Sequence, residues 1–153
     1  MSLPIKTEFA GFVQAAFEKG DTNFSSKILE QENVSVLQRL YGALIRADLE
    51  SFANQLSPEA EMKLYCPEKF KFIKRAIGRD EITKATVYNF SQVKEQETNL
   101  LSLVAQGNSI VVIGQEKGKF YETDESYDVQ FVQRFTISNG MVKQIHQIVL
   151  FSE

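Results

Sequence analysis

The chain has 153 residues, of which 43% are hydrophobic and 24% charged, and its formal net charge is -3. These values predict one soluble globular domain with a core of its own, and they argue against a general attraction to nucleic acid or to an anionic membrane. The single cysteine, Cys66, excludes an intramolecular disulfide. No run approaches the roughly 18 apolar residues of a membrane span and no signal pattern opens the chain, so we expect a cytoplasmic protein.

The N-terminal part of the sequence predicts a separate helical element. Residues 5–19 carry apolar side chains at helical spacing and stop at Gly20, which is typical of a short amphipathic helix. A polar stretch, residues 21–33, follows. We therefore interpret residues 1–33 as an N-terminal helical extension and residues 34–153 as the domain itself.

Two helices are predicted to meet at a bend near Asp48. Ser35, with Gln38 three residues later, has the pattern of a capping box and predicts a helix start, and an apolar stripe then continues to Ile45. Asp48 interrupts this stripe, so we interpret it as the N-cap of a second helix that ends before Pro58.

The later part of the chain predicts one more helix and an antiparallel sheet. Glu61–Cys66 alternates like a short strand ended by a proline, residues 68–79 indicate a loop or irregular hairpin, and a helix is expected from Gly78. Asn139-Gly140 is a strong hairpin signal. The remaining strands are expected at residues 97–105, 109–115, 127–137 and 141–151, with a turn at 116–119. Helices followed by antiparallel strands indicate an α+β fold.

The order of these parts resembles the nuclear-transport-factor-2-like (NTF2-like) superfamily, in particular its SnoaL-like and ketosteroid-isomerase-related branch. The resemblance rests on YGALIRADLESFANQLSPEAEMKLY, on the Gly-x-(Asp/Glu)-x-Ile pattern of residues 78–82, and on the closing strands from VVIGQ to IHQ, and it covers residues 34–151. It implies a cystatin-like α+β fold, in which a cone-shaped, curved antiparallel β-sheet packs on three helices around a pocket. It also implies a homodimer formed through the outer sheet face.

The same resemblance bears on catalysis. In the isomerase branch it implies a carboxylate base at the position of Cys66, an acidic donor at the position of Phe131 and a helix tyrosine near Tyr41. Both acidic residues are absent, because Cys66 and Phe131 occupy their positions, so steroid-isomerase chemistry is not expected. Cys66 is either a nucleophile or a small residue of the pocket wall, and we favour the wall. His146 falls on the outer sheet face, which favours a structural or interface histidine over an acid–base role.

A pocket of this kind suits an apolar small molecule held by a few polar groups. Gln133 and Gln147 either bind a carbonyl or hydroxyl of that molecule or bond to each other and to Tyr41. The predicted ligand-binding residues are Tyr41, Leu64, Cys66, Phe131, Gln133, Phe135, Gln147 and Val149.

Metal and cofactor sites are not expected. One histidine and one cysteine supply too few metal ligands, and no glycine-rich phosphate loop is present. A basic segment with interleaved Phe70 and Phe72 has three interpretations: a single-stranded nucleic-acid site, an anionic-ligand site at the pocket mouth, or a solvated loop, which we favour. Its basic residues are Lys69, Lys71, Lys74, Arg75 and Arg79, and they have a complementary acidic cluster in Glu122, Asp124, Glu125 and Asp128.

Three functions follow, in order of preference. The first is a SnoaL-like domain that binds a small apolar or amphipathic molecule in a Phe-rich pocket. The second is an isomerase, cyclase or hydrolase, and the third is a dimeric protein-interaction module whose cavity is filled by its own Phe side chains. For the second, the candidate proton-transfer residues are Asp48, Glu61, Tyr41, Cys66 and His146.

Overall fold

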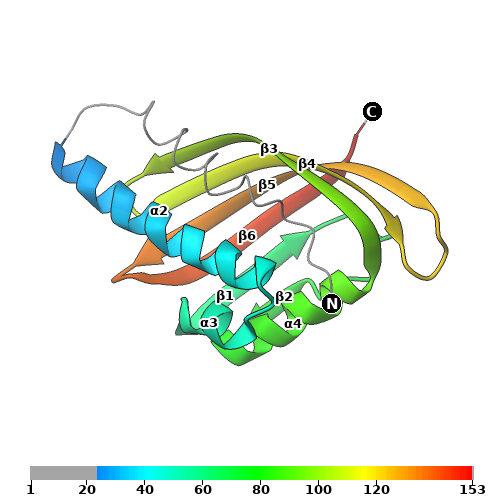
Figure 1. Cartoon of the computed structure of the whole chain (residues 1–153), viewed down its shortest axis with the longest axis horizontal. Coiled ribbons are helices and arrows are strands. Elements are labelled where there is room, and N and C mark those ends of the chain that lie inside the picture. The colour runs from blue at the N-terminus through cyan, green and yellow to red at the C-terminus, as the bar shows by residue number, and fades with distance from the viewer. Residues whose placement is uncertain (1–23, 153) are drawn as a thin grey trace.

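The computed structural model describes residues 24–152, which form three helices and one six-stranded sheet (Figure 1). The strand order is β2-β1-β6-β5-β4-β3. All neighbouring strands are antiparallel except β1 and β6, which are parallel. The elements are α2 (Phe24–Ile45), α3 (Leu49–Asn54), β1 (Leu56–Tyr65), β2 (Arg75–Ile77), α4 (Arg79–Ser91), β3 (Val93–Gln106), β4 (Ser109–Phe120), β5 (Ser126–Ser138) and β6 (Met141–Phe151).

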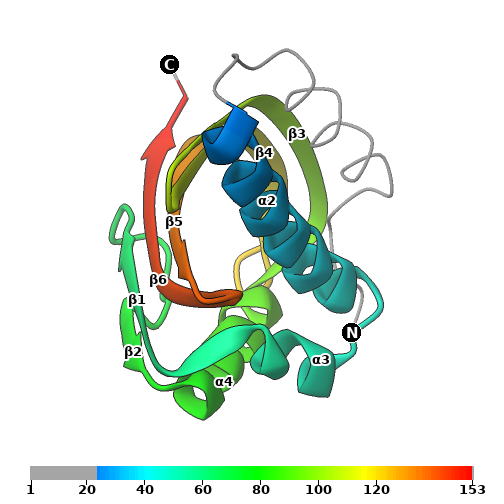
Figure 2. The same ribbon diagram turned by 90° about the vertical axis from the view of Figure 1, so that its left-hand side faces the viewer.

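The sheet is strongly curved and wraps around α2, while α3 and α4 lie beneath its lower edge (Figure 2). The sheet does not close on itself. This arrangement is the α+β cone that the sequence predicts. The core consists of the inward side chains of the sheet packed against the three helices, with Leu37, Phe52, Ile110 and Phe135 at 0–2% exposure. Within the described residues no helix is long and apolar enough to cross a membrane.

Local sequence signals account for several element boundaries. Asp48 is the N-cap of α3, where its carboxylate accepts a hydrogen bond from the Ser51 amide at 3.1 Å, as predicted. Asn139 and Gly140 have φ values of 51° and 73°, which is the backbone that a tight two-residue hairpin turn requires. Gly78 precedes α4 with φ 94°, so this predicted helix start is also confirmed.

The predicted helix start at Ser35 is wrong. Helix α2 begins at Phe24 and passes through Ser35, whose hydroxyl bonds to the Gln31 carbonyl at 2.9 Å. The predicted domain boundary between residues 33 and 34 thus lies inside one helix. Polar residues before it are used in tertiary contacts, because the Asn33 amide donates to the Gly107 carbonyl at 3.0 Å. The helix predicted at residues 5–19 lies outside the described residues.

The predicted turn at residues 116–119 is also wrong. These residues continue β4 as far as Phe120, and the chain turns only at residues 121–125. Lys117 is exposed while Gly118 is buried, so the Glu-Lys-Gly-Lys sequence that resembles a turn in fact alternates between the two faces of a strand. Strand β1 is likewise longer than predicted and begins at Leu56.

Candidate ligand-binding site

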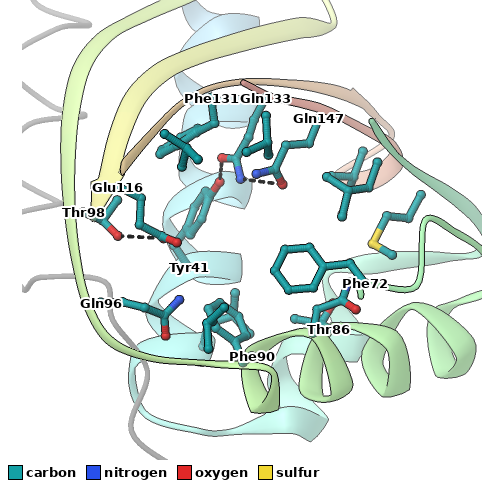
Figure 3. A pocket seen from close by; sticks show the side chains of 18 of the residues that line it. Tyr41, Phe72, Thr86, Phe90, Gln96, Thr98, Glu116, Phe131, Gln133 and Gln147 are labelled. Carbon is teal, nitrogen blue, oxygen red and sulfur yellow. Dashed lines mark hydrogen bonds between the residues drawn. The ribbon is translucent and has the colours of Figure 1, made fainter. Parts of the chain in front are cut away.

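A cavity of about 180 Å³ lies between the concave sheet face and helices α2 and α4, and it is partly open to solvent (Figure 3). Its wall is mostly apolar, because the inward positions of β5 and β6 carry large side chains and loop 66–74 adds two more rings. The phenylalanines of the wall are Phe52, Phe70, Phe72, Phe90, Phe131 and Phe135.

The wall includes every predicted ligand-binding residue except Cys66; those present are Tyr41, Leu64, Phe131, Gln133, Phe135, Gln147 and Val149. Cys66 follows the last residue of β1 and is half-buried against the core outside the cavity wall. Burial raises the pKa of its thiol, which disfavours the thiolate that a nucleophile requires.

One polar group of the cavity is a chain of three side chains on α2, β5 and β6. The Tyr41 hydroxyl donates to the Gln133 side-chain carbonyl, and the Gln133 amide donates to the Gln147 side-chain carbonyl at 3.3 Å (Figure 3). Gln133 and Gln147 are directly opposite in the β5–β6 register. Burial raises the pKa of Tyr41, so this residue is a neutral hydrogen-bond donor.

The second polar group is centred on Glu116, a residue that our sequence reasoning missed. Its carboxylate accepts a hydrogen bond from the Thr98 hydroxyl at 3.1 Å and another from the Tyr127 hydroxyl at 2.7 Å. The Gln96 side chain bonds to it as well. Burial raises the pKa of the Glu116 carboxyl above its ordinary value, although these hydrogen bonds act in the opposite direction. The signal that could have found it is the inward alternation of β4, which the predicted turn concealed.

Two glycines make room for this group. Gly114 and Gly118 lie on either side of Glu116 on the inner face of β4, directly opposite Phe131 and Tyr127 in the β4–β5 register. A Cβ at Gly114 would lie 2.3 Å from the Phe131 ring, and one at Gly118 would lie 2.6 Å from the Tyr127 hydroxyl oxygen. Only glycine therefore lets these rings cover β4 and brings the tyrosine hydroxyl to the carboxylate.

A β-bulge places Gln96 in the same group. The β3–β4 register shifts between Lys94 and Glu97, and Glu95 has φ 53°. A bulge inserts an extra residue and thereby re-aims the side chains on one side of it. Both Val93 and Gln96 line the cavity as a result.

No protein-family model and no curated protein matches the sequence. An NTF2-like protein from Burkholderia xenovorans LB400 has a TM-score of 0.68 at 20% identity, over 78% of this chain and 90% of that chain. TerC, co-crystallised with polyporic acid, has a TM-score of 0.61 at 17% identity, over 79% of this chain and 92% of that one. A Kribbella flavida protein described provisionally as a ketosteroid isomerase has a TM-score of 0.58 at 15% identity, over 80% of this chain and 81% of that one.

This chain has the NTF2-like fold. The resemblance seen in the sequence is thereby confirmed at the level of the fold.

In this NTF2-like fold the only histidine lies away from the cavity. His146 is opposite Arg134 and Lys63 on the outer sheet face, and its Nδ1 lies 2.8 Å from the Arg134 guanidinium. Burial, followed by the charges of Arg134 and Lys63, lowers the pKa of His146. Its predicted outward orientation is confirmed, and it takes no part in the cavity. Asp48 and Glu61 are also absent from the cavity wall.

The basic segment covers the loop between β1 and β2 and continues through β2, which begins at Arg75, to Arg79 at the start of α4. Its aromatic residues lie in the loop and point inward. Phe70 is 3% exposed and Phe72 lines the cavity, so neither ring is available to stack on a nucleic-acid base. Lys69 pairs with Glu125 at 2.5 Å within the same chain. The acidic cluster thus pairs with the basic segment at one point, while Asp124 pairs with Lys94 instead.

Proposed function

We propose that this NTF2-like domain binds a small, mostly apolar molecule in the cavity and orients it with the two polar groups described above. The observation that supports it best is an apolar, Phe-rich cavity of about 180 Å³ with polar side chains at two places on its wall. An apolar cavity of about 150 Å³ in another protein binds benzene, so this volume suits a compact ring system. The presence of polyporic acid in TerC, which has the same fold, is in line with such a ligand.

The chain of Tyr41, Gln133 and Gln147 would hold one polar group of the ligand. Tyr41 and Gln133 donate along the chain, so the side-chain NH₂ of Gln147 is its terminal donor and suits a ligand carbonyl or hydroxyl. The apolar residues Leu64, Phe131, Phe135 and Val149 of the predicted set would contact the ring system. This mode of binding corresponds to the SnoaL-like type that the sequence resembles.

The experiment is a native mass spectrum of the freshly purified protein, followed by titration of ¹⁵N-labelled protein with 2-methylnaphthalene. An added small mass, or saturable amide shifts from the residues of the cavity wall, supports the proposal. Thr86→Phe, which adds a ring to the cavity wall on α4, should weaken binding of the probe, whereas Lys84→Phe on the exposed side of the same helix should not. Equal binding to both variants would place the probe elsewhere and contradict the proposal.

A second candidate is an enzyme that moves a proton, because a carboxyl group lies in the cavity wall. Glu116, with its raised pKa, has the character of a general base or acid for an isomerase, cyclase or hydrolase. The test uses 2-tetralone in D₂O and follows deuterium uptake next to its carbonyl. Deuterium uptake that is faster with the wild type than in buffer alone, and that falls to the buffer rate with Glu116→Gln, would support an enzyme. Uptake equal to that in buffer would leave a binding protein.

We also propose that the domain is a homodimer that pairs through the outer sheet face. Tyr65, Ile148, Val132 and Ile113 are in register across β1, β6, β5 and β4, and each is 38–58% exposed. A row of this kind is typical of an interaction surface. Light scattering should give twice the chain mass, and Ile148→Lys should give a monomer. A monomeric wild type would contradict this proposal and, with it, the interaction-module function.

A further inference from the structure

We propose that the molecule bound in the cavity carries a hydrogen-bond donor, a hydroxyl or an amine, that binds the Glu116 carboxylate, and that anionic molecules are rejected there. This ligand class rests on the proposed binding function. It goes beyond that function because it says which chemical group of the ligand binds Glu116. Glu116 is a charged acceptor, whereas the glutamine pair offers a neutral donor.

The number of acceptor sites on Glu116 supports the inference. An ionised carboxylate has about four lone-pair sites. Thr98 donates to one oxygen and Tyr127 to the other, and the Gln96 side chain supplies a third bond. One acceptor site is therefore left over, on a residue that lines the cavity. A donor on the ligand that occupies this site would make a hydrogen bond to a charged group, which is stronger than a hydrogen bond between neutral groups, and would thereby stabilise the complex.

The charges around the carboxylate indicate what kind of donor fits. Within residues 24–152 no salt bridge involves Glu116. The one basic residue of the described cavity wall is Lys63, but its side chain belongs to the outer sheet face, where it is opposite His146 and its ammonium pairs with Glu61 at 3.1 Å. With no cation to neutralise it, the carboxylate repels a second negative charge, which favours neutral or cationic donors over carboxylates and phosphates.

The backbone features around Glu116 indicate that it is more than a structural partner of Tyr127. A glycine at position 118, a bulge at Glu95 and the inward Gln96 are all needed to surround this carboxylate with donors. A buried tyrosine hydroxyl such as that of Tyr127 needs no carboxylate partner, because a backbone carbonyl would satisfy it. Each of these features also keeps the carboxylate fixed in the direction of the cavity.

Matched probes test the inference. The probes are 2-naphthol, which has a donor, 2-methylnaphthalene, which has the same shape without one, and 2-naphthoate, which is anionic. On the wild-type protein 2-naphthol should bind about tenfold more tightly than 2-methylnaphthalene, as expected for a hydrogen bond to a charged group. Glu116→Met, which keeps the side-chain length and removes the acceptor, should abolish this preference.

Each other outcome is decisive. If both neutral probes bind the wild type equally, the inference is overturned while the proposed binding function stands. A 2-naphthol preference that persists in Glu116→Met places the donor on another residue and overturns it too. If neither probe binds, the proposed function fails and the inference fails with it. Should Glu116→Met not fold, Glu116→Gln serves instead: 2-naphthoate should bind this variant about tenfold more tightly than the wild type, and equal affinity would overturn the inference.

Discussion

Substitution of Gly118 by alanine is predicted to displace the Tyr127 ring. The added Cβ would lie 2.6 Å from the tyrosine oxygen and 2.7 Å from the ring carbon that bears it. The ring has little room to retreat, because Tyr127 is 5% exposed and packs against Phe70 and Phe120 with ring centroids 5.1 and 5.2 Å away. Movement of the ring also breaks its 2.7 Å hydrogen bond to Glu116.

The expected cost combines two effects. Overpacking of a well-packed core destabilises by about 1–3 kcal/mol, and loss of a hydrogen bond to a charged group adds about 1.5–3 kcal/mol. We therefore expect Gly118→Ala to lower the free energy of unfolding by about 2.5–6 kcal/mol, measured by urea denaturation with far-UV circular dichroism. The control is Gly42→Ala in α2, where the new Cβ meets the flexible Arg46 guanidinium at 3.2 Å. Alanine should stabilise that helix by about 0.5–1 kcal/mol.

A double-mutant cycle isolates the cause. Leucine at position 127 does not extend to the ring atoms that clash, so in a Tyr127→Leu background Gly118→Ala should no longer destabilise. Since alanine is favoured over glycine inside a strand, the sign should reverse to a gain of about 0.5–1 kcal/mol. An equal cost of Gly118→Ala in both backgrounds would refute the explanation that Gly118 is there to accommodate the Tyr127 ring.

Three further predictions concern the cavity and its surroundings. Burial raises the pKa of the Glu116 carboxyl above its ordinary 4.5. The contribution of this residue to the free energy of unfolding is therefore complete below about pH 4.5 and is lost as the pH rises through the folded-state pKa. Wild type should gain stability relative to Glu116→Gln as the pH falls from neutral to about 4.5, and urea midpoints that keep a constant difference over this range would contradict this. The Asn89 side chain makes hydrogen bonds with both the amide and the carbonyl of Ile73, at 2.8 and 3.2 Å. Asn89→Ala should therefore raise the hydrogen-exchange rate of the Ile73 amide. An unchanged rate would show that other contacts hold loop 66–74. Phe70→Ala should destabilise the protein by about 3–5 kcal/mol in urea denaturation, because the Phe70 ring packs on four other aromatic rings. Phe72→Ala should cost less, because Phe72 is only half-buried. Equal costs would count against the aromatic cluster as the anchor of loop 66–74.

Much of the fold could be predicted because its signals are local. The Asp48 cap, the Gly78 helix start and the Asn139-Gly140 hairpin each depend on a few adjacent residues. Strand alternation divides the side chains of β5 and β6 between two faces, and the resemblance to the NTF2-like superfamily indicated which face is inward. The inward positions of Gln133 and Gln147, and the outward position of His146, followed from the two together.

The second polar group could not be predicted in the same way, because its parts depend on non-local register. Residues 116–119 contain a glycine between two lysines and resemble a turn, yet the glycine is required by an aromatic ring on the next strand. Only the pairing of Gly118 with Tyr127 shows this requirement. The early start of α2 is similar, since Asn33 is satisfied by the Gly107 carbonyl, 74 positions away in the sequence.

The measurement that tests the central claim most directly is the set of intermolecular nuclear Overhauser effects between 2-naphthol and isotope-labelled protein. Binding in the cavity predicts contacts from the naphthol ring to Phe131, Phe135 and Val149, which line it. The outer face of β6 provides the competing apolar site, with Ile148 and Leu150 at 47% and 62% exposure. Contacts to Ile148 and Leu150 without any to Val149 would contradict the account and assign the affinity for apolar molecules to the outer face of the sheet.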